Sequence, residues 1–218
     1  MYDLVDVLPD AEIEPGTNVL VAGPPLTGKR EIAFDILRGG MENGDGTIVV
    51  TTKDSADKVL EEFPSSSDAG TPSSDPANAS TNVGVVDCVT KQRGIGTVED
   101  DPRIKYASSP VDMTGIGIKL SEFLQEFYEN RGVTRNRVLM HSVSTLLMYS
   151  DLQTVFRFLH VFTGRIQSAD ALGLYVIDST SHDDQTMNTL KQLFDGAIEL
   201  EPDDDGDELA IKTAGLSV

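Results

Sequence analysis

The chain has 218 residues, which is long enough for one α/β domain with a sizeable hydrophobic core. Its 17 Lys and Arg against 36 Asp and Glu give a net charge of −19, which argues against a chain-wide affinity for nucleic acid phosphates. No run approaches the roughly 18 apolar residues of a membrane span, and the single Cys88 excludes an internal disulfide. Such acidity is typical of salt-rich cells and the start lacks a basic leader, so we expect a halophilic, cytoplasmic protein.

Strands and helices are predicted to alternate along the chain. After a lead-in to about Asp10 and a turn, runs rich in β-branched and apolar residues predict strands at 19–22, 47–52, 83–89, 137–143 and 173–178. Apolar residues at helical spacing predict helices that begin near residues 28, 55, 114, 151 and 184. A hairpin of 197–200 and 209–212 closes the chain. This order predicts a mainly parallel sheet with helices on both faces and an antiparallel C-terminal hairpin.

Local chemistry predicts several helix ends. We expect the first helix to stop at Gly39-Gly40, because glycine favours the left-handed conformation that ends helices. For the helix near residue 114, Asp112 or Thr114 can cap the start, and Gly132 is predicted to end it. These residues therefore set the expected boundaries of two helices.

One segment is predicted to be a disordered insertion. Residues 64–82 are all Ser, Pro, Ala, Asp, Gly, Thr or Asn, with no large apolar side chain to offset the entropy of ordering. The stretch from 91 to 110 is Gly-rich and carries no clear assignment. We therefore predict a single domain over 1–218 with a disordered insertion at 64–82.

The clearest motif joins the first predicted strand to the first helix. It matches the phosphate-binding pattern G-x-x-x-x-G-K-[ST] at seven of eight positions, which are occupied by Gly23, Pro24, Pro25, Leu26, Thr27, Gly28, Lys29 and Arg30. Glycines let backbone N–H groups turn toward phosphate oxygens, and the helix N-terminus and Lys29 add positive charge. The eighth position, where a Ser or Thr hydroxyl would hold Mg²⁺, is Arg30. The loop predicts an ATP or ADP site, and Arg30 puts the metal in doubt.

With these elements in place, the chain resembles the RecA superfamily, and most closely its archaeal KaiC-like branch. The resemblance rests on the motif and on similar residues at 13–17, 40–50, 138–146, 194–200 and 211–212. It implies a RecA-like P-loop NTPase core that binds ATP with Mg²⁺. It also implies assembly into rings or filaments in which a neighbouring subunit completes the site.

Four positions depart from the family's pattern where the family does its chemistry. They are Arg30 for the metal-holding Ser or Thr, Lys53 for the first of two acids, His141 for the acid before Ser142, and Ala214 for an arginine. Because metal and arginine supply most of the acceleration of phosphoryl transfer, these departures predict weakened or lost hydrolysis. The remaining candidate catalytic residues are Asp54, His141 and Asp178.

Each of these residues also has a purely structural interpretation. Arg30 is either a substitute charge for the metal or a solvated residue of the first helical turn. Asp54 either keeps a carboxylate role or caps the following helix, and Asp178 either senses the terminal phosphate or caps a helix. His141 is either a ligand or pH switch, or a hydrogen-bonded residue at a strand end.

The leading hypothesis is an ATP- or ADP-binding, RecA/KaiC-like protein with a regulatory or scaffolding role in signal transduction. Its expected partners are the nucleotide and either further copies of the chain or a related ATPase in a mixed assembly. The alternatives are an active KaiC-like ATPase, a recombinase-type DNA repair accessory protein, and a binding module that has lost nucleotide altogether. The DNA alternative is disfavoured by the −19 charge and by the lack of a basic, aromatic strip.

Overall fold

The computed structural model describes residues 1–4, 7–63, 82–94, 98, 100–202 and 209–216. In this part of the chain the main sheet contains β3 (Asn18–Gly23), β4 (Gly46–Thr51), β5 (Val83–Asp87), β6 (Ile104–Tyr106), β7 (Asn136–His141), β8 (Leu172–Asp178), β9 (Gly196–Pro202) and β10 (Leu209–Ala214). Their spatial order is β10-β9-β3-β8-β7-β4-β5-β6. Every neighbouring pair is parallel except β9 and β10. The predicted parallel sheet with an antiparallel C-terminal hairpin is therefore confirmed.

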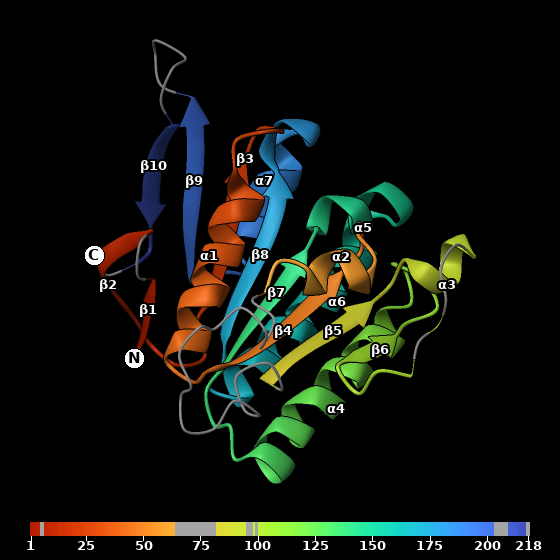
Figure 1. The fold of residues 1–218 in the computed structure, drawn as a ribbon. Coiled ribbons are helices and arrows are strands. Elements are labelled where there is room, and N and C mark those ends of the chain that lie inside the picture. Colours follow the sequence, from red (N-terminus) through yellow and green to blue (C-terminus); the bar gives the residue numbers. More distant parts are fainter. Residues whose placement is uncertain (5–6, 64–81, 95–97, 99, 203–208, 217–218) are drawn as a thin grey trace.

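Helices cover both faces of this sheet (Figure 1). They are α1 (Lys29–Glu42), α2 (Ala56–Leu60), α3 (Thr90–Arg93), α4 (Met113–Arg131), α5 (Val143–Tyr149), α6 (Leu152–Ser168) and α7 (Asp184–Lys191), with a 3₁₀ turn η2 (Ser179–Ser181). One face carries α1, α2 and a two-stranded antiparallel ribbon of β1 (Tyr2–Leu4) and β2 (Leu8–Ile13), and the other carries α4 to α7. Among the described residues no helix is both long and apolar enough to span a bilayer.

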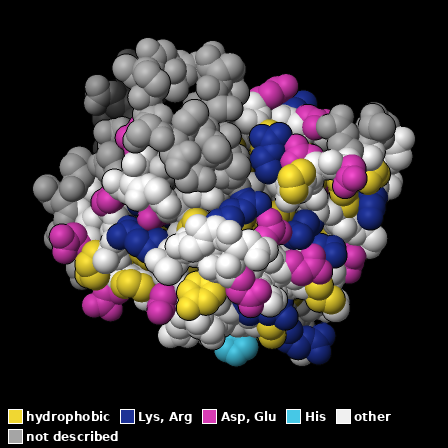
Figure 2. Space-filling view, turned by 60° about the horizontal axis from the view of Figure 1, so that its bottom comes forward, with side chains coloured by type: hydrophobic (Ala, Val, Ile, Leu, Met, Phe, Trp, Pro, Cys, Tyr) yellow, Lys and Arg dark blue, Asp and Glu magenta, His cyan; other side chains and the backbone are white. Residues whose placement is uncertain are grey.

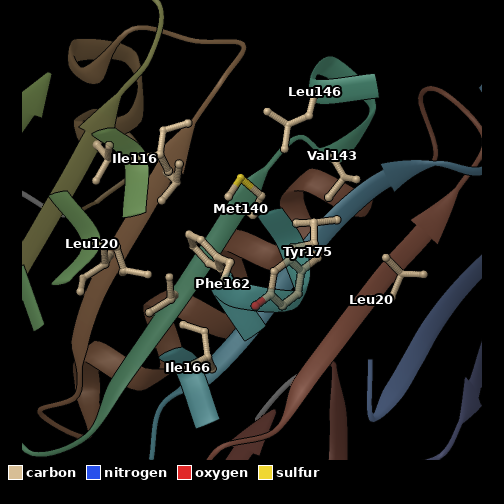
Figure 3. Packing of buried hydrophobic residues seen from close by; sticks show 14 of the residues in the cluster. Leu20, Ile116, Leu120, Met140, Val143, Leu146, Phe162, Ile166 and Tyr175 are labelled. Carbon is tan, nitrogen blue, oxygen red and sulfur yellow. The ribbon is translucent and has the colours of Figure 1, made fainter. Parts of the chain in front are cut away.

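The strands alternate their side chains between two hydrophobic layers. Leu20 of β3 packs into the layer under α4 to α7, whereas its neighbours Val19 and Val21 pack into the layer under α1. Figure 3 shows the first layer, where Phe162 of α6 lies next to Tyr175 of β8. Each fully buried side chain of this size stabilises the fold by about 1.5–3 kcal/mol. Burial on both faces explains why the strands are nearly continuous apolar runs.

The predicted end of the first helix at Gly39-Gly40 is wrong. The helix α1 continues to Glu42, and it ends where Gly44 adopts φ 80°. Gly40 instead serves packing, because a Cβ atom at this position would overlap the guanidinium of Arg137 on β7. A glycine in a helix can therefore mark a close approach as well as a stop.

Other boundaries follow local chemistry. Asp112 caps α4 by accepting a hydrogen bond from the N–H of Gly115 at 2.9 Å, and Gly132 ends the helix with φ 66°. The predicted strand 137–143 is too long, since Ser142 caps α5 and Val143 is already helical. The ribbon β1–β2 and the elements α3, β6 and α5 were not predicted. The predicted disordered insertion at 64–82 lies, except for Asn82, outside the described residues.

Candidate functional site

The loop after β3 lies at the edge of the sheet where the parallel strands end. Gly23 is paired with Asp178 across β3 and β8, and residues 24–28 lead from there into α1. A Cβ atom on Gly23 would lie 2.8 Å from Oγ1 of Thr27, which itself donates a hydrogen bond to the carbonyl of Pro24 at 2.9 Å. Gly28 adopts φ 71°. Both glycines of the motif are thus required by the geometry of the loop.

The backbone of this loop retains the features that bind anions. In the described chain, the N–H groups of residues 26–30 donate to no backbone acceptor. They precede or open the 14-residue helix α1, whose N-terminus carries partial positive charge. Leu26 stands at φ 66° with its side chain fully exposed. The arrangement fits a phosphate group, which would accept hydrogen bonds from these N–H groups.

Lys29 is held between the loop and β8. Its Nζ donates to the carbonyl oxygen of Pro24 at 2.7 Å and lies 2.5 Å from Oδ1 of Asp178. The residue is only 7% exposed. The interpretation of Asp178 as a helix cap is not supported, because its side chain makes no capping hydrogen bond to η2. A phosphate in the loop would compete with the carboxylate of Asp178 for this ammonium group.

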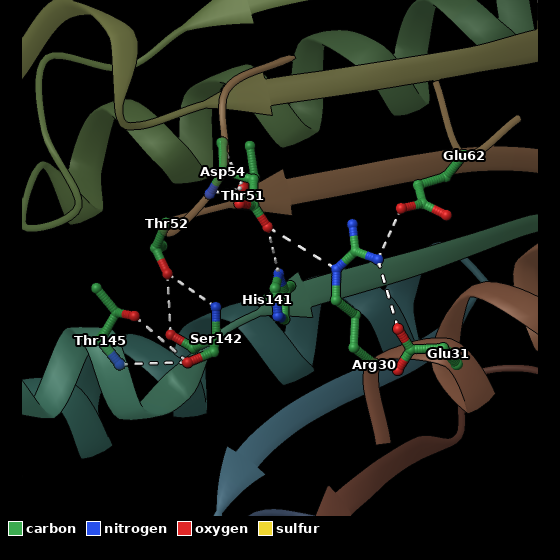
Figure 4. Close-up of polar contacts among 9 residues, drawn as sticks. All are labelled: Arg30, Glu31, Thr51, Thr52, Asp54, Glu62, His141, Ser142 and Thr145. Carbon is green, nitrogen blue, oxygen red and sulfur yellow. Dashed lines mark hydrogen bonds and ion pairs between the residues drawn. The ribbon is translucent and has the colours of Figure 1, made fainter. Parts of the chain in front are cut away.

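Arg30 belongs to a charged cluster and is not simply solvated. Its Nη1 lies 2.7 Å from Oε1 of Glu62, and its Nε lies 3.8 Å from Oδ2 of Asp54 (Figure 4). The guanidinium also stacks 4.5 Å from the ring centre of Phe34, one helical turn further along α1. Glu62 additionally contacts Arg38, so Arg30, Phe34 and Arg38 form one face of α1 at a spacing of four residues. Three carboxylates, including that of Glu31 at 4.0 Å, and an aromatic ring therefore position the cation of Arg30.

Asp54 faces this cluster and does not cap α2. The N–H of Ala56 donates instead to Oδ2 of Asp87 at 2.8 Å, from the end of the neighbouring strand β5. The carboxylate of Asp54 lies 4.0 Å from Nδ1 of His141 as well as near Arg30. The interpretation of Asp54 as a helix cap is therefore wrong, and its carboxylate remains available to the site.

His141 is a buried, neutral imidazole at neutral pH. Burial lowers its pKa from 6.5 to about 4, and the nearby charge of Arg30 acts in the same direction while Asp54 opposes it. Among the described residues its buried Nδ1 has no hydrogen-bond partner. The alternative of a hydrogen-bonded residue at the strand end thus fails for this nitrogen. The peptide bond that follows, between His141 and Ser142, is cis.

The side chains at this edge do not fit a magnesium ion. Mg²⁺ takes oxygen ligands at about 2.0–2.1 Å in near-octahedral geometry. Arg30 supplies no hydroxyl oxygen to a metal. Its guanidinium also lies 3.8 Å from the carboxylate of Asp54, which belongs to the loop after β4. His141 offers a nitrogen where a carboxylate would hold the water shell. Over the described residues there is no group of three or more His, Cys, Asp and Glu side chains that could bind a metal.

The structure brings the predicted site residues together, and only Ala214, the position where the family has an arginine, does not join them. Residues 23–30, Asp54, His141 and Asp178 all lie at the same edge of the sheet. Ala214 does not, because it pairs with Ala197 near the start of β9, away from the loop. The sequence reasoning missed Glu62, since no motif marks it and only the packing beside α1 brings it to Arg30. It also missed the contact of Ser144 with His182, whose Oγ and Nε2 are 2.9 Å apart.

Comparisons with known proteins agree with this architecture. A family described as "Family of unknown function (DUF7504)" matches residues 16–200. A KaiC-like protein from the hyperthermophilic archaeon Pyrococcus horikoshii superimposes with a TM-score of 0.56 at 13% identity, over 91% of this chain and 77% of its own. An uncharacterized protein of the same organism, crystallised with an unknown peptide, gives 0.66 at 11% identity over 94% of both chains. No curated protein matches the chain. The predicted RecA-like fold is therefore confirmed.

Proposed function

The chain belongs to the DUF7504 family of unknown function, and we propose from its own site that it binds ATP or ADP through residues 23–30. We further propose that hydrolysis is weakened or lost and that Mg²⁺ is not needed for binding. The observation that carries this proposal is a contrast at one edge of the sheet, between groups that fit a phosphate and groups that do not fit a metal. Its N–H groups and Lys29 fit a phosphate, whereas Arg30 and His141 occupy positions that do not fit the metal.

Electrostatics support binding without the metal. A nucleotide brings several negative charges into a chain whose net charge is −19, so it needs local cations. Lys29 lies in the loop, and Arg30 follows it on the first turn of α1. The guanidinium of Arg30 would turn from Glu62 and Asp54 toward the nucleotide, and its permanent charge would then provide part of the neutralisation that Mg²⁺ otherwise provides.

The proposed biological role follows from a nucleotide that binds to the loop without being hydrolysed. Binding would draw Lys29 away from Asp178 and so alter contacts at the end of β8. We propose that this change regulates assembly, either with further copies of the chain or with a related, active ATPase. The acidic composition fits the cytoplasm of a halophilic archaeon. We propose that the protein acts there in signal transduction.

Calorimetric titration tests the proposal directly. The chain would be titrated with ATP and ADP in concentrated KCl, with Mg²⁺ and with EDTA. We expect similar binding in both conditions for the native chain and loss of binding in Lys29→Ala. Arg30→Thr restores a hydroxyl and removes the cation, so its binding should become dependent on Mg²⁺. Lys58→Ala removes an exposed lysine of α2 and is the matched control for the loss of a lysine.

Two results would refute the proposal. Absence of binding heat in every mixture would mean that the loop no longer holds nucleotide. Strong dependence of the native chain on Mg²⁺ would mean that Arg30 does not replace the metal. Either outcome can be read without any measurement of hydrolysis.

An active ATPase is the second candidate, because two carboxylates remain at the edge of the sheet. Asp54 lies beside Arg30, and Asp178 lies 2.5 Å from Lys29. Mg²⁺-dependent release of phosphate in concentrated KCl, abolished by Lys29→Ala, would favour this candidate. The DNA-binding alternative has no comparable support, and on the face shown in Figure 2 acidic and basic side chains of the described residues are intermixed.

A further inference from the structure

A separate pocket lies beside the loop, at the same edge of the sheet. It has a volume of about 500 Å³ and is lined by residues that follow β4, β5, β7 and β8, with none from the loop itself. This volume falls within the range of pockets that bind small molecules. Asp178 is the one residue of this lining that also contacts Lys29 of the loop, and the remaining described lining residues have no part in the proposed phosphate site.

The polar wall of the pocket centres on Ser144. Its Oγ accepts a hydrogen bond from the backbone N–H of Asp178 at 2.9 Å and lies 2.9 Å from Nε2 of His182. Burial lowers the pKa of His182, while Asp178 and Asp183 oppose the shift, so the ring is neutral at neutral pH. In the tautomer with the proton on Nε2, both lone pairs of Ser144 are occupied. Its O–H group is then free to donate into the pocket.

The described lining of the pocket also includes a cation. Lys53 lines the same pocket from the loop after β4, and its side chain is exposed. In the described part of the chain it makes no ion pair, unlike Lys29 and Arg30. An unneutralised ammonium in a chain with a net charge of −19 favours an anionic ligand.

Apolar and aromatic side chains also line the pocket. Met148 and Tyr149, at the end of α5, are 75% and 58% exposed, and both line the pocket. Leu147 lines it as well and is partly buried. Exposed thioether and aromatic groups around a polar wall are typical of sites that cover the apolar part of a ligand.

We propose that this pocket binds a small organic carboxylate with a short apolar or aromatic group. The carboxylate would lie between Lys53 and Ser144, and the apolar group would pack against Met148 and Tyr149. A single cation matches a single negative charge, and the carboxylate of Asp178 in the pocket wall disfavours more highly charged phosphates. The proposal does not depend on nucleotide binding.

Titration of the ¹⁵N-labelled chain, without nucleotide, tests this proposal. Phenylacetate is the probe, and phenylacetamide is the uncharged control of the same shape. We expect saturable shifts of the amide signals of Lys53, Ser144 and His182 with phenylacetate, and at least about fivefold weaker binding of phenylacetamide.

Two variants complete the experiment. Lys53→Gln, an exposed substitution, should weaken phenylacetate binding about fivefold, whereas Lys58→Gln on α2 should leave it unchanged. The proposal is overturned if phenylacetate gives no saturable shifts, if the amide binds equally well, or if Lys53→Gln binds normally. It is also overturned if the saturable shifts fall on the amide signals of residues 26–30 and not on those of Lys53, Ser144 and His182, because the probe would then occupy the phosphate loop.

Discussion

Acidification should destabilise the folded chain through one buried imidazole. The pKa of His141 falls from 6.5 to about 4 on folding, so between these values the unfolded chain binds a proton that the folded chain excludes. The stability contributed by the neutral ring is complete above about pH 6.5 and is lost as the pH falls toward 4. Each unit corresponds to about 1.4 kcal/mol, so the loss reaches about 2.5 kcal/mol near pH 4.5 and about 3 kcal/mol at lower pH.

Urea unfolding, followed by circular dichroism, measures this loss. The native chain and His141→Asn would be compared at about pH 7.5 and about pH 4.5 in concentrated KCl, where a screening length of about 3 Å suppresses surface charge effects. The native chain should lose about 2.5 kcal/mol more than the variant. His160→Asn, at an exposed histidine of α6, is the control and should behave as the native chain does.

The same experiment tests the cause of the pKa shift. Arg30→Gln removes a positive charge that helps to keep His141 neutral, so it should raise the pKa of His141 and reduce the acid-induced loss. Burial of a neutral His141 is refuted as the cause of the acid-induced loss if His141→Asn loses as much stability as the native chain over this pH range. That result would mean that the ring is hydrated or hydrogen-bonded in the folded protein.

Three further substitutions test contacts that only the structure shows. Asp178→Asn removes the competitor of a phosphate for Lys29 and should tighten ATP binding about fivefold in calorimetry; weaker binding would contradict this competition. Arg137→Met leaves the buried carboxylate of Asp45 short of a partner and should cost about 3 kcal/mol in urea unfolding, with part regained by adding Asp45→Asn. Gly40→Ala, which would normally stabilise a helix, should instead cost about 1–3 kcal/mol through overlap with Arg137, and a gain in stability would disprove that overlap.

Hydrophobic periodicity was sufficient to predict the main sheet because its strands are buried on both faces. Val19 to Ala22 and the run around Leu174 are apolar for this reason, and their order along the chain implied parallel pairing. Short elements escaped prediction because they carry too few residues for a period. The strand β6 has three residues and the helix α3 has four, and tertiary contacts decide their conformation.

The eight residues of the proposed phosphate loop are consecutive, so the motif can be identified from the sequence without knowledge of the fold. In the proposed phosphate site, Gly23 and Gly28 would act through the backbone, and Lys29 through its side chain at the start of a helix that begins within the motif. Spacing along eight residues determines such a site almost completely. The structural requirement at each glycine then agreed with the motif.

The ion pairs and the protonation of the charged groups depend on residues that are distant in the sequence. Sequence left two interpretations open for Arg30, Asp54 and His141, because each depends on what lies opposite the side chain. Packing placed Glu62 against Arg30, and Asp87 accepts the hydrogen bond at the start of α2 that one of the two interpretations assigned to Asp54. A motif can identify residues of one site when they are close together in the sequence. Coulomb energy and desolvation depend on distances across the sheet, which only the tertiary structure determines.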